Sequence, residues 1–250
     1  MECEESKMSP DSTENNFEGP IASSYELINL ISPNTIPIAK RIGEIVSSFL
    51  PQEEITGFEI GCGTGICTFE LFNKRDKIKI TAIDSSSDML EQARKKLGDE
   101  IKKGRLSIVE TDALTALKKT PSSNMDFIAS NFTIHNFDEN YRNEILAEIF
   151  RVLKSGGIFI NGDRYAISDP REHLKETQKT VRKLFQSFQE IERLDLLEEW
   201  IIHLLSDESP GIIMHLDAAL IELKNLGFVE IIIDFRDGVD TLLYAYKPAA

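Results

Sequence analysis

The sequence predicts an α/β fold with a mostly parallel sheet and helices on both of its faces. From residue 55 to about residue 161, short apolar segments typical of buried strands alternate with segments of helical periodicity. A glycine-rich turn, Gly61-Cys62-Gly63-Thr64-Gly65, directly follows the first of these strands. With 41% hydrophobic and 28% charged residues, the 250-residue chain has the composition of an ordinary globular domain.

The N-terminal part of the chain is expected to differ from the rest. Residues 1–20 are polar and contain few apolar side chains, so we expect a flexible tail followed by one domain over residues 21–250. Residues 21–50 are predicted to form two helical pieces that are split before Pro33. Four apolar side chains recur at helical spacing in the second piece: Ile38, Ile42, Ile45 and Phe49.

The central elements are predicted from periodicity and from the turn and cap residues that flank them. The predicted strands are Ile55–Ile60, Lys77–Ile83, Leu106–Glu110, Met125–Ser130 and Ile158–Asn161. The predicted helices between them are Ile66–Asn73, Ser85–Leu97, Ala113–Lys119 and Glu139–Leu153. Ser85 or Ser86 is expected to cap the second helix, and Gly156-Gly157 to turn the chain into the fifth strand.

The regular alternation ends after the fifth strand, where residues 169–208 are predominantly helix-forming. One helix of that length is unusual in a domain of this size, so we expect a bent pair of helices. The pair is either a structural layer or a lid over a ligand site, because open α/β sheets bind ligands at the carboxyl ends of their strands. A helix over Leu216–Leu226 and strands over Val229–Asp234 and Thr241–Tyr246 follow, with Asp237-Gly238 predicting a hairpin turn between the strands.

Charge is distributed unevenly along the chain. The 28 basic and 42 acidic side chains give a formal net charge of −14, and the acids concentrate in residues 1–18 and 186–209. This acidity argues against nonspecific binding to nucleic acid or to an anionic membrane, both of which would repel the protein. A modest group of bases over residues 94–105 is interpreted as a solvated helix end rather than as an RNA-binding patch.

The cysteines and the apolar segments suggest a cytoplasmic protein. Cys3, Cys62 and Cys67 have neither the number nor the spacing of a disulfide framework, and no histidine cluster accompanies them, so we expect no metal site. The N-terminus is acidic and lacks the apolar stretch of a signal peptide. No run of about 18 apolar residues exists that would span a membrane. We expect a monomer or a homodimer.

Acidic side chains follow the second and third strands, next to the glycine-rich turn. Asp84 ends the second strand and can accept hydrogen bonds from both hydroxyls of a ribose. Asp112 follows the third strand and either caps the next helix or accepts from an adenine amino group. A dinucleotide site would need the spacing GxGxxG, whereas Gly61, Gly63 and Gly65 give GxGxG. Together these strand ends favour a nucleoside ligand of another kind.

Five ordered segments resemble the motifs of the class I S-adenosylmethionine-dependent methyltransferases. They are Phe58–Gly65, Thr81–Leu90, Glu110–Ala113, Met125–His135 and Lys154–Gly157. The resemblance covers roughly residues 40–165 and, more weakly, residues 214–247. It implies the three-layer Rossmann-like methyltransferase fold, with seven strands, an antiparallel C-terminal strand and a helical lid. It also implies S-adenosylmethionine as cofactor and S-adenosylhomocysteine as its product.

The resemblance carries roles over to individual positions. The residues implied to bind the cofactor are Glu59, Gly61, Cys62, Gly63, Asp84, Ser85, Met89, Asp112, Ala113 and Asn131. Phe132 is implied to lie with Asn131 near the transferable methyl group. Glu59 would orient the cofactor's ammonium group, Asp84 its ribose, and Asp112 with Ala113 its adenine.

Candidates for the chemistry and for acceptor binding are less well determined by sequence. His135 follows the fourth strand and is the candidate general base, because its ordinary pKa near 6.5 suits proton removal. A histidine that merely packs the loop is the favoured alternative. The candidate acceptor-binding residues are Tyr25, Asp163, Arg164 and Tyr165. A salt-bridged turn is the equally favoured alternative for residues 163–165, and a place in the core is the alternative for Tyr25. His173 and His203 lie among charges on predicted helices and are expected to be solvated, and Trp200 to be core.

The function predicted from these observations is methyl transfer to a small-molecule acceptor. Ser130-Asn131-Phe132-Thr133 lacks the paired prolines of many nucleic-acid and glutamine methyltransferases, and the chain has no basic extension. A tRNA or protein methyltransferase that uses a local basic patch is one alternative. A noncatalytic cofactor-binding module is a second, and other chemistry on the same cofactor is a third, since a fold does not fix a function.

Overall fold

The computed structural model describes residues 31–249, which form a seven-stranded sheet of order β3-β2-β1-β4-β5-β7-β6. The strands are β1 Ile55–Ile60, β2 Ile78–Asp84, β3 Leu106–Glu110, β4 Met125–Asn131, β5 Leu153–Arg164, β6 Val229–Asp237 and β7 Asp240–Tyr246. Only β7 runs antiparallel to its neighbours, β5 and β6. The predicted mostly parallel sheet with an antiparallel C-terminal strand is confirmed.

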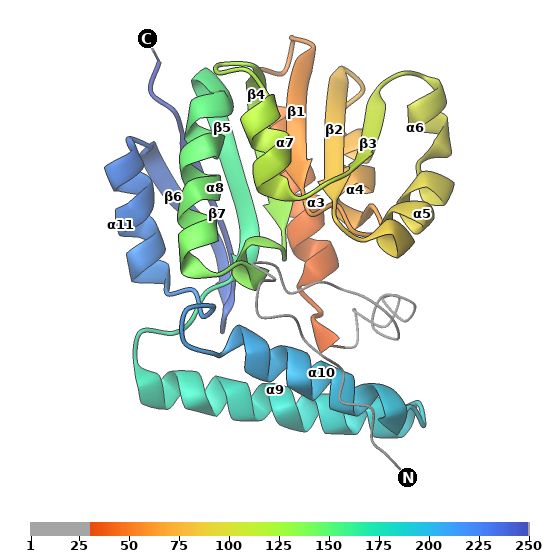
Figure 1. The fold of residues 1–250 in the computed structure, drawn as a ribbon, viewed down its shortest axis with the longest axis vertical. Coiled ribbons are helices and arrows are strands. Elements are labelled where there is room, and N and C mark those ends of the chain that lie inside the picture. Colours follow the sequence, from red (N-terminus) through yellow and green to blue (C-terminus); the bar gives the residue numbers. More distant parts are fainter. Residues whose placement is uncertain (1–30, 250) are drawn as a thin grey trace.

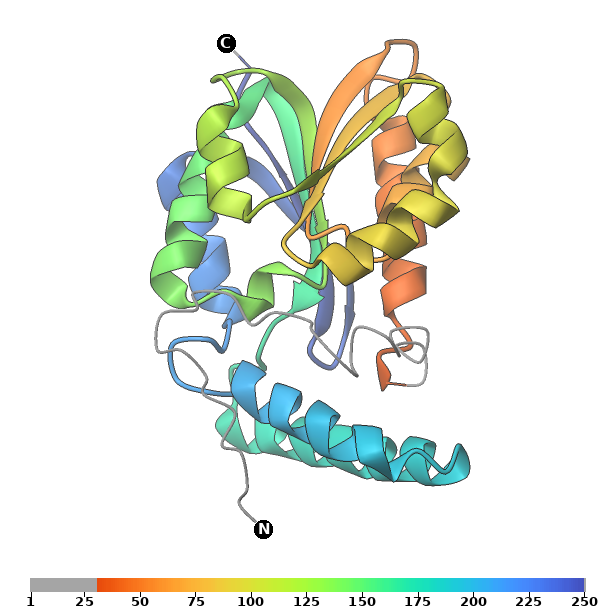
Figure 2. The ribbon, with the colours of Figure 1, turned by 45° about the vertical axis from the view of Figure 1, so that its right-hand side comes forward.

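Helices cover both faces of the sheet and give three layers (Figures 1 and 2). One face packs against α7 Ala113–Lys119, α8 Glu139–Val152 and α11 Leu216–Leu226. The other face packs against α3 Thr35–Ser48, α4 Ile66–Lys74 and α5 Ser87–Lys96. Because both faces are covered, the central strands are buried along almost their whole length, as β1 and β4 illustrate.

Most of the predicted elements are confirmed to within a few residues, with two local differences. Gly156-Gly157 lies inside β5 rather than before it, because Gly156 N and Gly157 O both bond the main chain of Lys247 and so extend the sheet. A short helix that the sequence did not predict, α6 Gly98–Lys102, follows α5. The first predicted helical piece and the predicted tail over residues 1–20 lie outside the described residues.

Residues 170–207 form the predicted pair of helices, α9 Pro170–Glu190 and α10 Leu194–Asp207. The chain reverses at Glu192, whose φ of 55° is the left-handed conformation that ends a helix. The two helices lie across the carboxyl edge of the sheet (Figure 1). They share a core made of Leu184, Phe188, Leu196, Leu197, Trp200 and Leu204. This small core is separate from the two that flank the sheet, so Trp200 is a core residue, as predicted.

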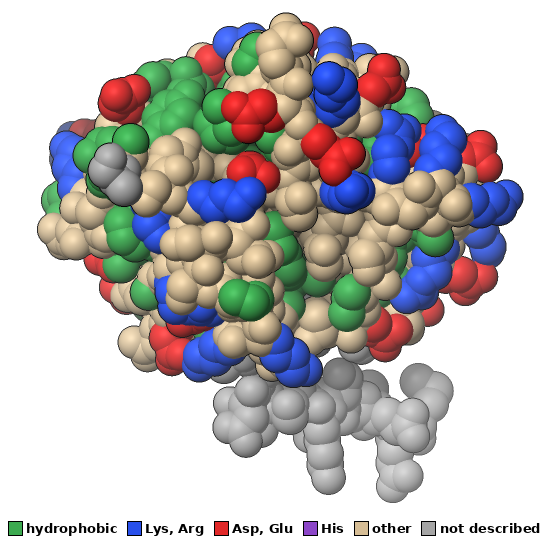
Figure 3. Space-filling model, turned by 90° about the horizontal axis from the view of Figure 1, so that it is seen from above, with side chains coloured by type: hydrophobic (Ala, Val, Ile, Leu, Met, Phe, Trp, Pro, Cys, Tyr) green, Lys and Arg blue, Asp and Glu red, His purple; other side chains and the backbone are tan. Residues whose placement is uncertain are grey.

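The surface opposite the helix pair carries mixed charge. Seen from that side, Lys and Arg side chains alternate with Asp and Glu (Figure 3). Four bases over residues 94–105 form ion pairs with nearby acids, such as Lys95 with Glu91 at 2.7 Å and Lys103 with Glu100 at 2.9 Å. This pairing agrees with a solvated helix end. Within residues 31–249, no helix is both long enough and apolar enough to cross a bilayer.

Candidate functional site

The predicted cofactor residues gather around a cavity at the carboxyl ends of β1, β2 and β4. Neighbouring strands β1 and β4 are where the strand order reverses, the position at which open α/β sheets bind ligands. The predicted residues that line the cavity are Glu59, Gly61, Cys62, Gly63, Asp84, Ser85, Met89, Ala113 and Asn131. Only Asp112 of the predicted set is not among the lining residues.

Asp84 holds the glycine-rich turn in place. Its Oδ2 accepts a hydrogen bond from Gly63 N at 2.8 Å, and its Oδ1 accepts one from Ser86 N at 2.9 Å. Each carboxylate oxygen keeps a second lone pair that can accept from a ligand hydroxyl. Burial raises the pKa of Asp84, while its bonds from Ser86 and Gly63 oppose that rise.

Two glycines of the turn are needed for different reasons. Gly61 has a φ of 66°, and a Cβ there would lie 2.2 Å from the side chain of Thr133, whose hydroxyl donates to Gly61 O at 3.2 Å. Gly63 has a φ of 51°, and a Cβ there would meet nothing within 4 Å. Gly61 is therefore fixed by the protein's own packing, whereas the open space over Gly63 leaves the main chain accessible to a ligand.

Four buried polar atoms on the cavity wall lack hydrogen-bond partners within the described part of the chain, and two of them belong to predicted cofactor residues. These two are Glu59 Oε2 and Asn131 Oδ1. A buried acceptor without a donor costs free energy, so both atoms fit a ligand that brings N–H groups. Burial raises the pKa of Glu59 to about 7. An ammonium group beside Glu59 would lower that pKa again. S-adenosylmethionine carries such a group in its amino-acid part.

The helix that follows β3 begins at Asp112, and here the two predicted interpretations separate. Asp112 Oδ1 accepts from Thr115 N at 2.8 Å and from the hydroxyl of Tyr141 at 3.2 Å, so the carboxylate caps α7. The cap interpretation therefore holds for this oxygen, and adenine binding by Asp112 stays a prediction. Ser86 rather than Ser85 caps α5, which leaves the exposed Ser85 on the cavity wall.

The two described cysteines are buried beside the glycine-rich turn. Burial, with the nearby carboxylate of Glu59, raises the pKa of both Cys62 and Cys67 well above the ordinary thiol value. Both therefore stay thiols near neutral pH, so neither is activated as a nucleophile. Cys62 serves as a small wall residue of the cavity.

A second cavity lies between the sheet and the helix pair, and it adjoins the first through shared wall residues. Thr35 and Phe132 line both cavities. Phe132 has a φ of 54°, an unusual conformation for an aromatic residue, and its N–H donates to Gly162 O at 2.7 Å. Strained residues of this kind concentrate at functional sites. The second cavity, here called the acceptor cavity, has a mixed wall. Its apolar residues include Leu184, Trp200 and Leu204, and its polar residues are Ser32, Thr35, His135, Arg164, Thr180, His203 and Asp207.

His135 enters this cavity wall from the short 3-10 helix Ile134–Asn136 that follows β4, and Asp163 at the end of β5 fixes its orientation. His135 Nδ1 lies 2.5 Å from Asp163 Oδ1, and Asp163 Oδ2 accepts from the main-chain N–H of Ile134 at 2.9 Å. Asp163 is fully buried, so its role is to position His135 rather than to contact a ligand. The bond at Nδ1 leaves Nε2 of the imidazole directed away from Asp163.

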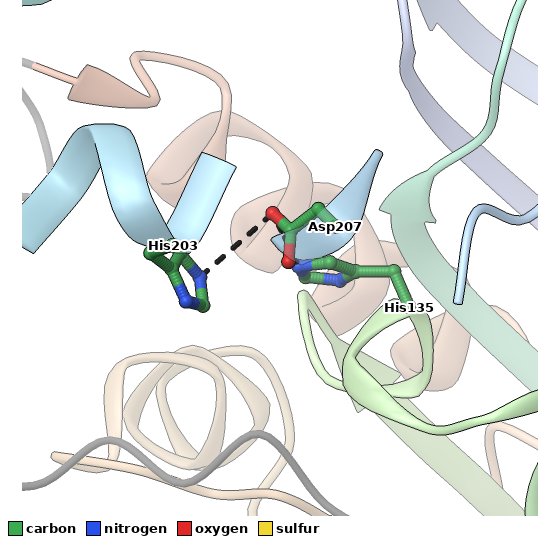
Figure 4. A group of neighbouring side chains, drawn as sticks. All are labelled: His135, His203 and Asp207. Carbon is green, nitrogen blue, oxygen red and sulfur yellow. Dashed lines mark ion pairs between the residues drawn. The ribbon is translucent and has the colours of Figure 1, made fainter. Parts of the chain in front are cut away.

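Asp207 completes this group from the last turn of α10. Its Oδ2 lies 3.8 Å from Nε2 of His135 and 3.8 Å from Nε2 of His203 (Figure 4). The same oxygen lies 3.6 Å from Nη1 of Arg164. Burial opposes the protonation of both imidazoles. In His135 the negative charges of Asp163 and Asp207 prevail and raise the pKa, whereas burial lowers the pKa of His203.

The remaining predictions for histidines and acceptor residues have mixed outcomes. The expectation that His203 is solvated is wrong, because the turn of α10 against the sheet buries it. His173 is also largely covered, and its Nε2 lies 2.6 Å from Glu208. Arg164 lines the acceptor cavity and is paired with Asp207 and Glu208, so acceptor binding by Arg164 stays a prediction. Tyr165 lines a different cavity beside α11 and accepts from Asn161 Nδ2 at 2.8 Å. Tyr25 lies outside the described residues.

Sequence reasoning missed Asp207, His203 and Thr35 as wall residues. A signal for the first two exists, because a histidine and an aspartate four residues apart lie on the same face of a helix. The prediction treated both as part of the acidic solvated surface. Five of the seven acids over residues 186–209 are indeed exposed, while Asp207 is buried and Glu208 is partly so.

Comparison with known proteins finds a matching domain profile and several relatives. The methyltransferase-domain profile matches residues 58–157, which include the glycine-rich turn, both strand-end acids and His135. A demethylmenaquinone methyltransferase of Leptospira interrogans is 35% identical over 112 residues, which are 45% of this chain and 44% of that protein. A carboxy-S-adenosyl-L-methionine synthase of Erwinia tasmaniensis is 24% identical over 156 residues, 61% of each chain. The matched segments thus span less than two thirds of these relatives.

A solved structure is similar over a longer part of the chain. A SAM-dependent methyltransferase from Archaeoglobus fulgidus has a TM-score of 0.60 at 14% identity, over 90% of this chain and 99% of that one. At this identity the likeness concerns the fold. Residues 58–157 thus match a methyltransferase-domain profile, and the described part of the chain has the fold of a SAM-dependent methyltransferase.

Proposed function

We propose that this protein transfers a methyl group from S-adenosylmethionine to a small-molecule acceptor. The observation that carries the proposal is the pair of adjoining cavities. One is lined by the predicted cofactor residues, the other is partly apolar, and they share Thr35 and Phe132. Two ligands held on either side of these residues would meet where Asn131 and Phe132 end β4. Both curated relatives described above bear names of enzymes whose chemistry concerns small molecules.

The chain's own residues would act mainly by holding and orienting. Glu59, Asn131 and the main chain over Gly63 would hold the amino-acid part of the cofactor, and Asp84 its ribose. When bound, S-adenosylmethionine supplies a sulfonium methyl group that needs no further activation. Methyl transfer then requires an acceptor atom held in line at a close distance, and that alignment is the main contribution of the protein to the rate.

The acceptor's proton is assigned to the His135–Asp163 pair. Asp163 fixes the imidazole through Nδ1, and the other nitrogen, Nε2, belongs to the wall of the acceptor cavity. The contact with Asp163 distinguishes His135 from a residue that merely packs the loop, because a catalytic histidine needs a fixed tautomer and orientation. We also propose that α9 and α10 act as a lid, because they form the far wall of the acceptor cavity.

The experiment that tests cofactor use is calorimetry with S-adenosylmethionine on the wild type and on Asp84→Ala. Loss of charged hydrogen bonds predicts an affinity weaker by about 100-fold or more in that variant. The matched control is Glu110→Ala, which removes an exposed carboxylate from the neighbouring strand end outside the cavity and should leave the affinity unchanged. A wild type that does not bind at millimolar ligand would contradict the proposal and leave a different role for the domain.

Transfer itself is tested with methyl-labelled S-adenosylmethionine and a cell extract treated with nuclease and protease. Label that enters the small-molecule fraction supports the proposal. Label that is incorporated only before digestion would instead establish the alternative of a tRNA or protein acceptor. Label that stays on the cofactor while the cofactor is modified would favour other chemistry, which the resemblance to a carboxy-S-adenosyl-L-methionine synthase makes worth measuring. A cytoplasmic location and a monomeric or homodimeric state are part of the same proposal.

A further inference from the structure

We propose that His135, His203 and Asp207 bind one divalent transition-metal ion in the wall of the acceptor cavity. The three side chains come from two elements that are far apart in the sequence, the 3-10 helix after β4 and the last turn of α10. Figure 4 shows the carboxylate of Asp207 between the two imidazole rings. One ligand atom of each side chain lies within 4.8 Å of the other two. The sequence alone had led us to expect no metal site.

The geometry fits an ion better than it fits hydrogen bonds. Nε2 of each histidine lies 3.8 Å from Asp207 Oδ2, beyond the range of an N–H···O bond. Both carboxylate oxygens of Asp207 are buried and have no hydrogen-bond partner within residues 31–249. Two ligands on one ion with bonds of about 2.1 Å lie up to about 4.2 Å apart, so an ion would need only small side-chain rotations.

The surroundings of His135 are those of a metal-binding histidine. Histidine ligands usually donate the second ring N–H to a carboxylate, which fixes the tautomer and strengthens the ligand. Asp163 occupies that place, with Oδ1 at 2.5 Å from His135 Nδ1. Asp163 in turn accepts from the main-chain N–H groups of Ile134 and Arg164, both at 2.9 Å, so its own position is fixed.

The balance of charge also favours a cation. Three carboxylates gather here, on Asp163, Asp207 and Glu208, and the guanidinium of Arg164 is the permanent cation beside them, 3.6 Å from Asp207 and 3.3 Å from Glu208. With neutral imidazoles these four side chains carry a net charge of −2, Arg142 also interacts with Asp163, and a divalent ion would offset the remaining negative charge. Two imidazoles and one carboxylate suit zinc or another first-row ion rather than magnesium or calcium.

A bound ion would favour an acceptor with a hydroxyl or thiol group. This part of the inference rests on the proposed function. An ion with three protein ligands keeps open positions, and it lowers the pKa of a hydroxyl or thiol that binds there. The acceptor's proton would leave to water, and the deprotonated heteroatom would attack the methyl carbon. The new bond forms from the lone pair on that heteroatom, while the sulfur–carbon bond pair stays on the cofactor's sulfur. In the metal-bound protein Nε2 of His135 would hold the ion, so this route would replace direct removal of the acceptor's proton by the imidazole.

The site is tested with the full chain, stripped by a chelator and then titrated with Zn²⁺ by calorimetry and with Co²⁺ by visible absorption. We expect one ion per chain, and a weakening of about 100-fold or more in His203→Gln through the loss of a ligand. The matched control is His215→Gln, which removes an exposed histidine that lines neither the acceptor cavity nor the cluster and should change the affinity by less than about threefold. Asp163→Asn should weaken binding by about 10- to 100-fold through its effect on His135.

The outcomes separate the metal site from the proposed function. The inference is overturned if the wild type takes up no ion at millimolar concentration, or if His203→Gln binds as tightly as the wild type. Binding is measured without S-adenosylmethionine, so the metal site stands even where no methyl transfer is found. Transfer that persists unchanged in chelated protein, together with a normal metal titration, would overturn only the step in which the ion binds the acceptor.

Discussion

The cofactor cavity and the acceptor cavity are built in contrasting ways. The cofactor cavity uses the main chain of a glycine-rich turn and the ends of neighbouring parallel strands, and Asp84 ties these parts together through main-chain N–H groups. The polar wall of the acceptor cavity uses side chains from β5, from the turn after β4 and from α10. The shape of the cofactor cavity depends on the backbone conformation of single residues, whereas the shape of the acceptor cavity depends on how the helix pair docks against the sheet. Variants should therefore affect one cavity without the other.

The largest effect is expected from Gly61→Ala. The new Cβ would lie 2.2 Å from the Thr133 side chain at a φ of 66°, so the turn must shift and cofactor affinity should fall by about 100-fold. Gly104→Ala is the matched control, because Gly104 also has a positive φ, of 70°, but its Cβ would meet nothing within 4 Å. Calorimetry with S-adenosylmethionine should find the control within about threefold of the wild type. Equal losses in both variants would mean that backbone strain alone matters.

Asp163→Asn should impair methyl transfer without weakening the binding of the cofactor. The amide cannot replace the carboxylate as acceptor for both His135 Nδ1 and the main chain, so labelled-methyl transfer should fall by about 10- to 100-fold. Cofactor affinity should stay within about threefold, since Asp163 does not line the cofactor cavity. Asp126→Asn is the control, a distant aspartate that also accepts from a main-chain N–H, that of Thr56. A matching loss of cofactor affinity in Asp163→Asn would show that the two cavities are coupled.

Leu196→Ala tests whether the helix pair is a separate unit of stability. Leu196 is fully buried in the core between α9 and α10, and its truncation should destabilise the pair by about 2–5 kcal/mol. Hydrogen exchange should then be faster in α9 and α10 but unchanged in β1 and β4. Leu194→Ala is the control on the same helix, because Leu194 is exposed. Faster exchange throughout the sheet would mean that the pair and the sheet unfold together.

The smallest effect is a pH dependence that belongs to the cofactor cavity alone. Burial raises the pKa of Glu59 to about 7 from an ordinary value of 4.5. The folded protein thus holds a proton that the unfolded chain releases, so this group stabilises the fold below about pH 4.5 and loses that contribution as the pH rises through 7. Cofactor affinity should change in the opposite direction, because the ionised carboxylate attracts the ammonium group.

Between pH 6 and pH 8 the ionised fraction of a group with this pKa rises by about tenfold, and cofactor affinity should rise by a similar factor. Glu59→Gln removes the titrating proton and should flatten that profile, as calorimetry at a series of pH values would reveal. A profile of the same slope in Glu59→Gln would assign the dependence to another group, with Asp84 the next candidate because its pKa is also raised by burial.

Sequence alone determined the sheet, its antiparallel end and the wall of the cofactor cavity. Strands and helices depend on local periodicity, and the glycine turn and Asp84 have roles set by backbone conformation within a short stretch of chain. The same locality explains the ambiguity at Asp112, since a helix cap and a ligand acceptor require the same residue at the same place.

Only the tertiary structure decided which charged residues are buried together. Asp207 and His203 look like their exposed neighbours in the acidic segment, and they become a buried group because α10 docks across the carboxyl edge of the sheet beside His135. That docking depends on a core between two helices and on the direction in which the chain reverses at Glu192. Contacts between positions about 70 residues apart leave no periodic trace in the sequence, so the polar wall of the acceptor cavity had to be found in space.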